Sequence, residues 1–152
     1  TFWAGLKISN VAIYTSDNDQ AYFVYATDDV SAGALTANTN LHFVVSINGV
    51  DHLTDLNIVV LANTVYHLKI VVNPDGSCSP FVNGVQYGVN QDAGTVNTEP
   101  IANSNQTSGV MRTSDDDDEV ALKPYVGIQT LDTANVVKSI TLHYQKLKQL
   151  IT

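Results

Sequence analysis

The chain is poor in cysteine, in charged side chains and in long apolar runs, and each shortage excludes a class of protein. Its 152 residues contain one cysteine, Cys78, so no internal disulfide can form. No apolar stretch reaches the length of about 18 residues that a membrane-spanning helix needs, so we expect no membrane partner. The first residues lack the pattern of a signal peptide. Because the chain begins at Thr1 rather than Met, we expect an excised or processed piece of a longer protein.

Charged residues make up only 14% of the chain, and most of them are acidic. Seven Lys and Arg stand against 15 Asp and Glu, which gives a net charge of −8 and a pI of about 4.5. Such a field repels phosphate backbones, so we predict that nucleic acid is not a partner. The acidity suits solubility, cation binding or docking onto a basic surface, and the composition leaves all three open.

What is present is a strand pattern, because apolar residues recur at period two rather than 3.6. The segments with this pattern, or with a β-branched and aromatic composition, are residues 2–8, 21–26, 41–47, 58–61, 65–72, 78–82, 85–89, 120–128 and 136–147. In the last of them, Ile140, Leu142 and Tyr144 alternate with polar residues, which predicts one face on a core and one in water. Residues 144–151 also fit helical spacing.

Asparagine–glycine pairs mark chain reversals between these strands. Asn48-Gly49 and Asn83-Gly84 suit tight hairpins, because asparagine tolerates and glycine favours a left-handed backbone. Residues 73–76, with the sequence Asn-Pro-Asp-Gly, form a further turn signal. Short strands separated by such turns predict an all-β fold, a two-sheet antiparallel β-sandwich or jelly roll that forms a single domain over residues 1–152.

The strand pattern stops between residues 90 and 119, where the chain is rich in small polar residues. A structureless loop of this length is uncommon in a compact domain, so we predict a disordered excursion, a functional loop or an arm that orders against a neighbour. The segment ends in five consecutive carboxylates, namely Asp115, Asp116, Asp117, Asp118 and Glu119. Calcium takes six to eight oxygen ligands and suits such a run, and the alternative is a solvated charge cluster.

Three pieces of the chain resemble the central hairpin of concanavalin A-like (laminin-G-like) lectin and glucanase jelly rolls. They are an aromatic-His strand at residues 66–72, a Pro-Asp-Gly turn at residues 74–76, and an aromatic-aliphatic-Asn-Gly strand at residues 81–85. Residues 123–128 resemble the strand of that fold which carries a Pro and a small residue beside the final strand. The resemblance implies the concanavalin-like form of the jelly roll.

The order of features along the whole chain resembles phage virion structural proteins more closely. The shared features are an opening like residues 3–6, a Ser-Asp-Asn-Asp-Gln segment at residues 16–20 before an aromatic strand, and a close like residues 125–147. This resemblance implies a place on the surface of a phage particle.

Residue patterns that could carry catalysis are scarce. Glucanases of the concanavalin-like family carry Glu-x-Asp-x-x-Glu on the active strand, whereas Glu99 and Glu119 are the two glutamates here and neither begins that pattern. No Gly-x-Ser-x-Gly elbow occurs, and Cys78 has no neighbouring cation in the sequence to activate its thiol. The histidines lack metal-ligand spacing, and those on strands are expected to be surface or packing residues. The four histidines are His42, His52, His67 and His143, and His42, His67 and His143 are the ones on predicted strands. We therefore predict that the chain has no catalytic residues and is not an enzyme.

The resemblance therefore implies a non-enzymatic structural module of a phage virion, either a capsid decoration (cement) protein or a fibre or spike domain. It would contact other virion proteins or sister subunits as a homo-oligomer, for example a trimer. Trp3, Tyr25 and Met111 are the candidate interface residues, because aromatic residues and Met are enriched at interfaces, and core packing is their alternative role. The alternative function is a lectin-like, carbohydrate-binding module that recognises a host surface glycan. Calcium is the one cofactor that the sequence leaves open.

Overall fold

The computed structural model describes residues 1–7, 19–26, 40–47, 50–72, 78–87, 122–128, 139–146 and 148. Every regular element among them is a β-strand. In this part of the chain there is accordingly no helix long and apolar enough to cross a membrane.

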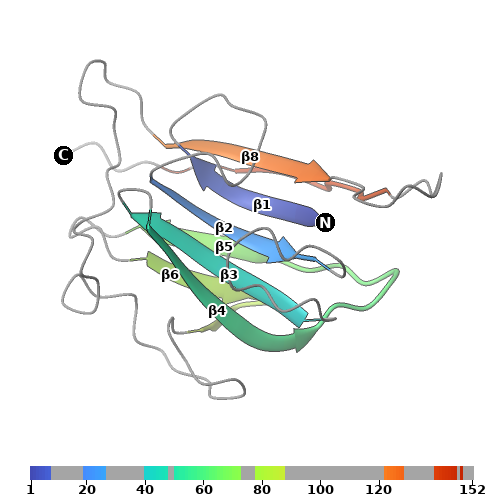
Figure 1. Cartoon of the computed structure of the whole chain (residues 1–152). Coiled ribbons are helices and arrows are strands. Elements are labelled where there is room, and N and C mark those ends of the chain that lie inside the picture. The colour runs from blue at the N-terminus through green and yellow to red at the C-terminus, as the bar shows by residue number, and fades with distance from the viewer. Residues whose placement is uncertain are drawn as a thin grey trace, which may run out of the picture.

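The strands form two antiparallel sheets, which Figure 1 shows one behind the other. The larger sheet has the order β4-β3-β2-β1-β8. Its members are β1 (Phe2–Lys7), β2 (Gln20–Tyr25), β3 (Asn40–Ile47), β4 (Val50–Val59) and β8 (Lys123–Ile128). The smaller sheet has the order β5-β6-β7, made of β5 (Leu68–Val72), β6 (Cys78–Val82) and β7 (Val85–Gln86). The predictions of an all-β chain and of two antiparallel sheets are confirmed.

The hairpin predicted at Asn83-Gly84 is confirmed in detail. Val82 pairs with Val85, so two residues reverse the chain between β6 and β7. Both turn residues have a positive φ, 51° at Asn83 and 84° at Gly84, as a type I′ turn requires. The strands β3 and β4 likewise pair at Ile47 and Val50, although residues 48–49 and 73–77 lie outside the described ranges.

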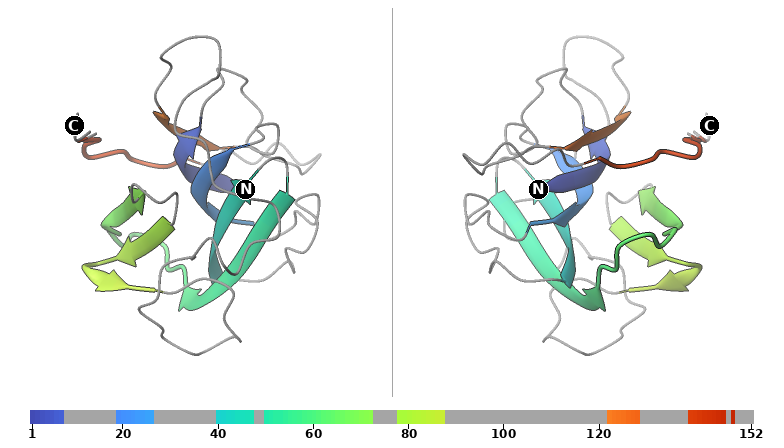
Figure 2. Two further views of the ribbon diagram at one scale, coloured as in Figure 1. Left: turned by 90° about the vertical axis from the view of Figure 1, so that its left-hand side faces the viewer. Right: turned by 90° about the vertical axis from the view of Figure 1, so that its right-hand side faces the viewer.

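The main core lies between the two sheets, which face each other in Figure 2. One face of β2 and β3 supplies Phe23 and Phe43, whose ring centroids lie 5.0 Å apart, and β6 supplies Cys78 and Val82. Because strand side chains alternate between faces, every second residue of β2 and β3 enters this core. Each fully buried large apolar side chain stabilises the fold by roughly 1.5–3 kcal/mol.

The opposite face of the five-stranded sheet is also buried. Trp3, Tyr22, Val24 and Val44 form a second cluster there, and Tyr125 of β8 packs against it. β2 is consequently apolar on both faces, which explains why residues 21–26 form a continuous apolar run rather than an alternating one.

Several predicted strands differ in the structure. The strand predicted at 58–61 is the end of the longer β4, and of the one predicted at 85–89 β7 covers Val85–Gln86, with residue 87 outside it. Residues 139–146, inside the segment predicted at 136–147, form no strand, and all eight are exposed. Alternation shows which face a strand would bury, but a strand also needs a partner for its backbone groups, and no described strand pairs with this segment. Residues 65–67 also lie outside β5, since the Tyr66 hydroxyl accepts a hydrogen bond from the Leu61 N–H and fixes a loop there instead.

Candidate functional site

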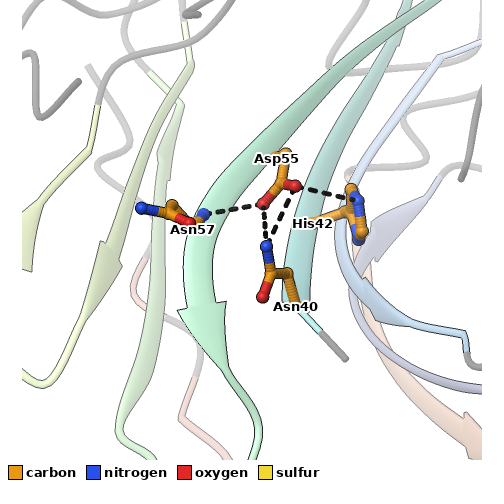
Figure 3. A network of polar contacts seen from close by, with 4 residues as sticks. All are labelled: Asn40, His42, Asp55 and Asn57. Carbon is orange, nitrogen blue, oxygen red and sulfur yellow. Dashed lines mark hydrogen bonds and ion pairs between the residues drawn. The ribbon is translucent and has the colours of Figure 1, made fainter. Parts of the chain in front are cut away.

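A network of four polar residues links β3 and β4 (Figure 3). The side-chain amide of Asn40 donates to both carboxylate oxygens of Asp55, at 3.1 Å each. The backbone N–H of Asn57 donates to Oδ1 of Asp55 at 2.7 Å. His42 completes the network, with Nε2 lying 3.8 Å from Oδ2 of Asp55. The Asp55 carboxylate is thus the centre of the network.

This network sits on a β-bulge. Leu41 pairs with Ile58, but the next residue, His42, pairs with Asp55, so Leu56 and Asn57 have no partner on β3. Asn57 has a φ of 54°, which asparagine tolerates better than most residues. By accepting the Asn57 N–H, the carboxylate satisfies a backbone donor that the bulge removes from the ladder. The bulge is therefore held by a side chain two residues earlier in the same strand.

Burial lowers the pKa of His42 below its ordinary value of about 6.5, because desolvation disfavours the imidazolium. The Asp55 carboxylate and the Asn40 backbone favour the charged form, but their effect is smaller. The His42 side chain is 3% exposed, and its Nδ1 makes no hydrogen bond among the described residues. His42 is therefore neutral at neutral pH.

A neutral histidine at this distance from a carboxylate is not arranged for proton transfer. The 3.8 Å separation exceeds hydrogen-bond length, and general-base work needs a contact of roughly 2.6–3.2 Å. The described residues also contain no group of three or more His, Cys, Asp and Glu that could hold a metal ion. The arrangement instead stabilises the pairing of β3 with β4. Asp55 holds the Asn57 backbone by a hydrogen bond, and His42 packs as a buried side chain.

Trp3, predicted as an interface residue, lies in the core cluster on the outer face of the larger sheet. It is 6% exposed, and its indole crosses the backbone of Gly127 on β8. A Cβ built on Gly127 would lie 2.3 Å from Cζ2 of the indole, so only glycine leaves room for the ring. Within the chain Trp3 therefore packs in a core cluster, and its ring is not exposed. Core packing was the alternative role that the sequence left open.

Tyr125, close to Gly127 on β8, carries a cation on its ring. The ammonium of Lys7 lies 4.7 Å from the Tyr125 ring centroid, and Lys7 as a whole is 4% exposed. A buried lysine needs such compensation, because desolvating an ammonium is costly. This outer face therefore combines aromatic rings with buried polar groups.

Of the other predicted site residues, one is partly buried and the rest lie outside the described ranges. Tyr25 is partly buried and packs against the core between the sheets. Met111 and the predicted calcium ligands Asp115, Asp116, Asp117, Asp118 and Glu119 lie outside the described residues. The interface role predicted for Met111 and the calcium site predicted at residues 115–119 therefore stay predictions.

Besides Val85 and Ile128, the exposed large apolar side chains of the described residues fall into two groups that the sequence did not single out as contacts. Val59, Leu61 and Val65, at the end of β4 and in the following loop, are 52%, 59% and 55% exposed. The second group lies in residues 139–146, called the C-terminal segment below, where Ile140, Leu142 and Tyr144 are 40%, 55% and 70% exposed. Isolated exposed apolar residues are ordinary, but grouped ones mark contact surfaces.

The comparisons with known proteins give no match to a family model, to a curated protein or to a solved structure.

Proposed function

We propose that this chain is a non-enzymatic structural module of a phage particle, a decoration protein of the capsid or a domain of a fibre or spike. Its role is to make protein–protein contacts at the particle surface. The observation that carries the proposal is a two-sheet body with exposed apolar side chains at the end of β4 and along the C-terminal segment. Such a body suits assembly, because its core needs no partner while its exposed apolar groups do.

The fold proposed for this module is the concanavalin-like jelly roll. Supporting it, the motif residues at 66–72 and 81–85 lie on or beside neighbouring antiparallel strands, β5 and β6. His67 and Asn83 also bond to each other: the His67 N–H donates to Oδ1 of Asn83, and the Asn83 N–H donates to the His67 carbonyl, both at 2.9 Å. The backbone of His67 is therefore joined to Asn83 at the turn between β6 and β7.

The proposed role is tested by locating the chain in purified particles. Mass spectrometry should find it at a stoichiometry that matches a symmetric capsid or fibre position, and cryo-microscopy should show the sandwich at that position. Purified chain should also bind expanded capsids that lack it and raise their melting temperature. Particles without the chain, together with polysaccharide hydrolysis by the purified protein, would overturn the proposal.

A carbohydrate-binding role is the second candidate, and Tyr144 is the observation that favours it. At 70%, it is the most exposed large hydrophobic side chain of the described part, and an exposed ring can stack on a sugar. A glycan array would then give binding that Tyr144→Ala removes and that Ile140→Ala, a change at another exposed apolar residue of the same segment, leaves intact. Binding to capsids without any glycan signal favours the structural role instead.

A further inference from the structure

The turn between β6 and β7 is built from a dipeptide that is chemically reactive. In an Asn-Gly pair the backbone nitrogen of glycine can attack Cγ of the asparagine side chain, and glycine favours this because it has no side chain to obstruct the approach. A C–N bond forms, the Cγ–Nδ2 bond breaks, and the side-chain amide leaves as ammonia with the proton of the glycine nitrogen. Water then opens the resulting succinimide ring to aspartate or isoaspartate. Asn83-Gly84 is therefore a candidate site of deamidation.

Neither burial nor steric cover restrains this reaction at Asn83-Gly84. Both residues are exposed, and nothing lies within 4 Å of a Cβ built on Gly84. The water that the second step consumes reaches the pair from solvent. Any restraint on the reaction must therefore come from the conformation of the turn.

The type I′ turn holds the reacting atoms apart. Asn83 is its first central residue, with a φ of 51°, and in this turn type such a residue has a ψ of about +30°. At this ψ the Gly84 nitrogen lies opposite the Asn83 Cβ across the Cα–C bond. Ring closure needs the nitrogen and Cβ on the same side of that bond, because reacting atoms must approach to about 3–3.5 Å. The succinimide can therefore form only after the turn opens.

Two hydrogen bonds to His67 restrain Asn83 as well. The His67 N–H donates to Oδ1 of Asn83, and the Asn83 N–H donates to the His67 carbonyl, both at 2.9 Å. His67 directly precedes β5, whereas Gly84 leads into β7, and β6 lies between β5 and β7 in the sheet. The bond from the His67 N–H consequently holds Cγ toward the β5 side of β6, away from the Gly84 nitrogen.

We propose that Asn83 is a deamidation site whose rate is set by opening of the turn between β6 and β7. The closed turn protects the side chain, and an opening that frees Oδ1 from His67 lets the ring form. The strand β7 spans only two residues at the edge of the smaller sheet, and Val85 is 49% exposed. Pairing of this kind opens at a lower free energy than the core does. The site does not depend on the role proposed for the chain.

Deamidation makes a passing opening of this turn permanent. Aspartate at position 83 would keep an acceptor for the His67 N–H and would add one negative charge. Isoaspartate, which forms when water opens the ring at its other carbonyl, adds a methylene group to the main chain. A turn lengthened in this way no longer fits between Val82 and Val85, which the present turn joins with two residues. Isoaspartate at this position therefore marks chains in which the β6–β7 pairing has been lost.

The first test compares the folded full chain with the same chain unfolded in urea. Aged samples are digested, and mass spectrometry measures aspartate and isoaspartate at position 83. Deamidation should be roughly tenfold or more slower in the folded chain, because the hydrogen bonds of the turn must break first. A peptide of residues 81–86, aged in both solutions, corrects for any effect of urea on the reaction itself. Equal rates at Asn83 in the folded and unfolded chains would overturn the proposal.

The second test removes one of the two bonds to Asn83 without changing the Asn-Gly pair. His67→Pro lacks the N–H that binds Oδ1, and it should raise the rate in the folded chain roughly threefold or more. His67→Ala keeps that backbone N–H and should deamidate at the wild-type rate. The emission of buried Trp3 shows whether each variant is folded. A folded His67→Pro variant that deamidates no faster than the wild type would contradict the proposal, and if this variant does not fold, the urea comparison decides by itself.

Discussion

Individual residues decide whether large side chains fit on the outer face of the five-stranded sheet. A Cβ at Gly5 would lie 2.3 Å from the Cβ of Tyr22, as a Cβ at Gly127 would from the Trp3 indole. Gly84 differs, because nothing lies within 4 Å of a Cβ there and its need for glycine comes from its φ of +84°. The same residue type thus serves two separate physical requirements.

Gly127→Ala is expected to destabilise the chain by about 1–3 kcal/mol, since the indole of Trp3 must shift to admit the new methyl group. Urea unfolding followed by the emission of the single tryptophan measures this change. In a Trp3→Ala background, followed by circular dichroism, the same substitution should cost much less. An equal cost in both backgrounds would show that the indole is not the obstacle. Gly84→Ala should cost about 1–2 kcal/mol with or without Trp3, since its penalty is in the backbone.

His42 makes stability depend on pH. Its pKa is lowered by burial in the folded chain, so below about pH 6.5 the unfolded chain binds a proton that the folded chain does not. The free energy of unfolding should consequently decrease as the pH falls from about 7.5 to about 5.5, a window in which ordinary carboxylates stay charged. His42→Gln should flatten this dependence in denaturant titrations, and His143→Gln, at an exposed position, should leave it unchanged. A slope that survives His42→Gln would assign the dependence to another group.

At the scale of elements, the bulge in β4 keeps two kinds of residue on their proper faces. The two extra residues preserve the alternation, so Leu56 and Ile58 both reach the core between the sheets while Asp55 stays on the face of His42. The bulge also disturbs an edge strand that would otherwise present ten residues to another chain. A single carboxylate therefore contributes to both the register and the protection of this edge.

Asp55→Ala is expected to lower stability by about 1–3 kcal/mol, because the Asn57 N–H and the Asn40 amide lose their acceptor. Hydrogen exchange at the Asn57 amide should become faster in this variant. The matched control is Asn57→Gly, which keeps the carboxylate and suits the φ of 54°, and it should be neutral or slightly stabilising. Unchanged exchange in Asp55→Ala would mean that the bulge does not need its side-chain acceptor.

At the scale of the whole molecule, a net charge of −8 on 152 residues sets up repulsion within the chain and between copies. Raising NaCl from about 10 mM to about 300 mM shortens the Debye length from roughly 30 Å to under 10 Å, and should raise the melting temperature and favour association. Calcium chloride at matched ionic strength should raise the melting temperature further if residues 115–119 bind the ion, and a chelator should reverse that part. An identical rise of the melting temperature in both salts would show that charge screening alone explains it and that residues 115–119 do not bind calcium.

The sequence by itself determined the local features of this protein. Period-two apolar patterns, or a β-branched and aromatic composition as in β2, placed β1, β2, β3, β6 and β8 to within a few residues. Asn83-Gly84 specified its turn because the backbone angles there depend on those two residues. The sequence did not predict the register of β3 against β4. The contact of Asn40 and His42 with Asp55 was therefore not predicted either, because this register depends on two unpaired residues in β4. The sequence likewise left Trp3 between a contact role and core packing, and it predicted a strand over residues 136–147, of which residues 139–146 form none. Burial and strand pairing belong to neighbours distant in the chain, and only the tertiary structure decided them.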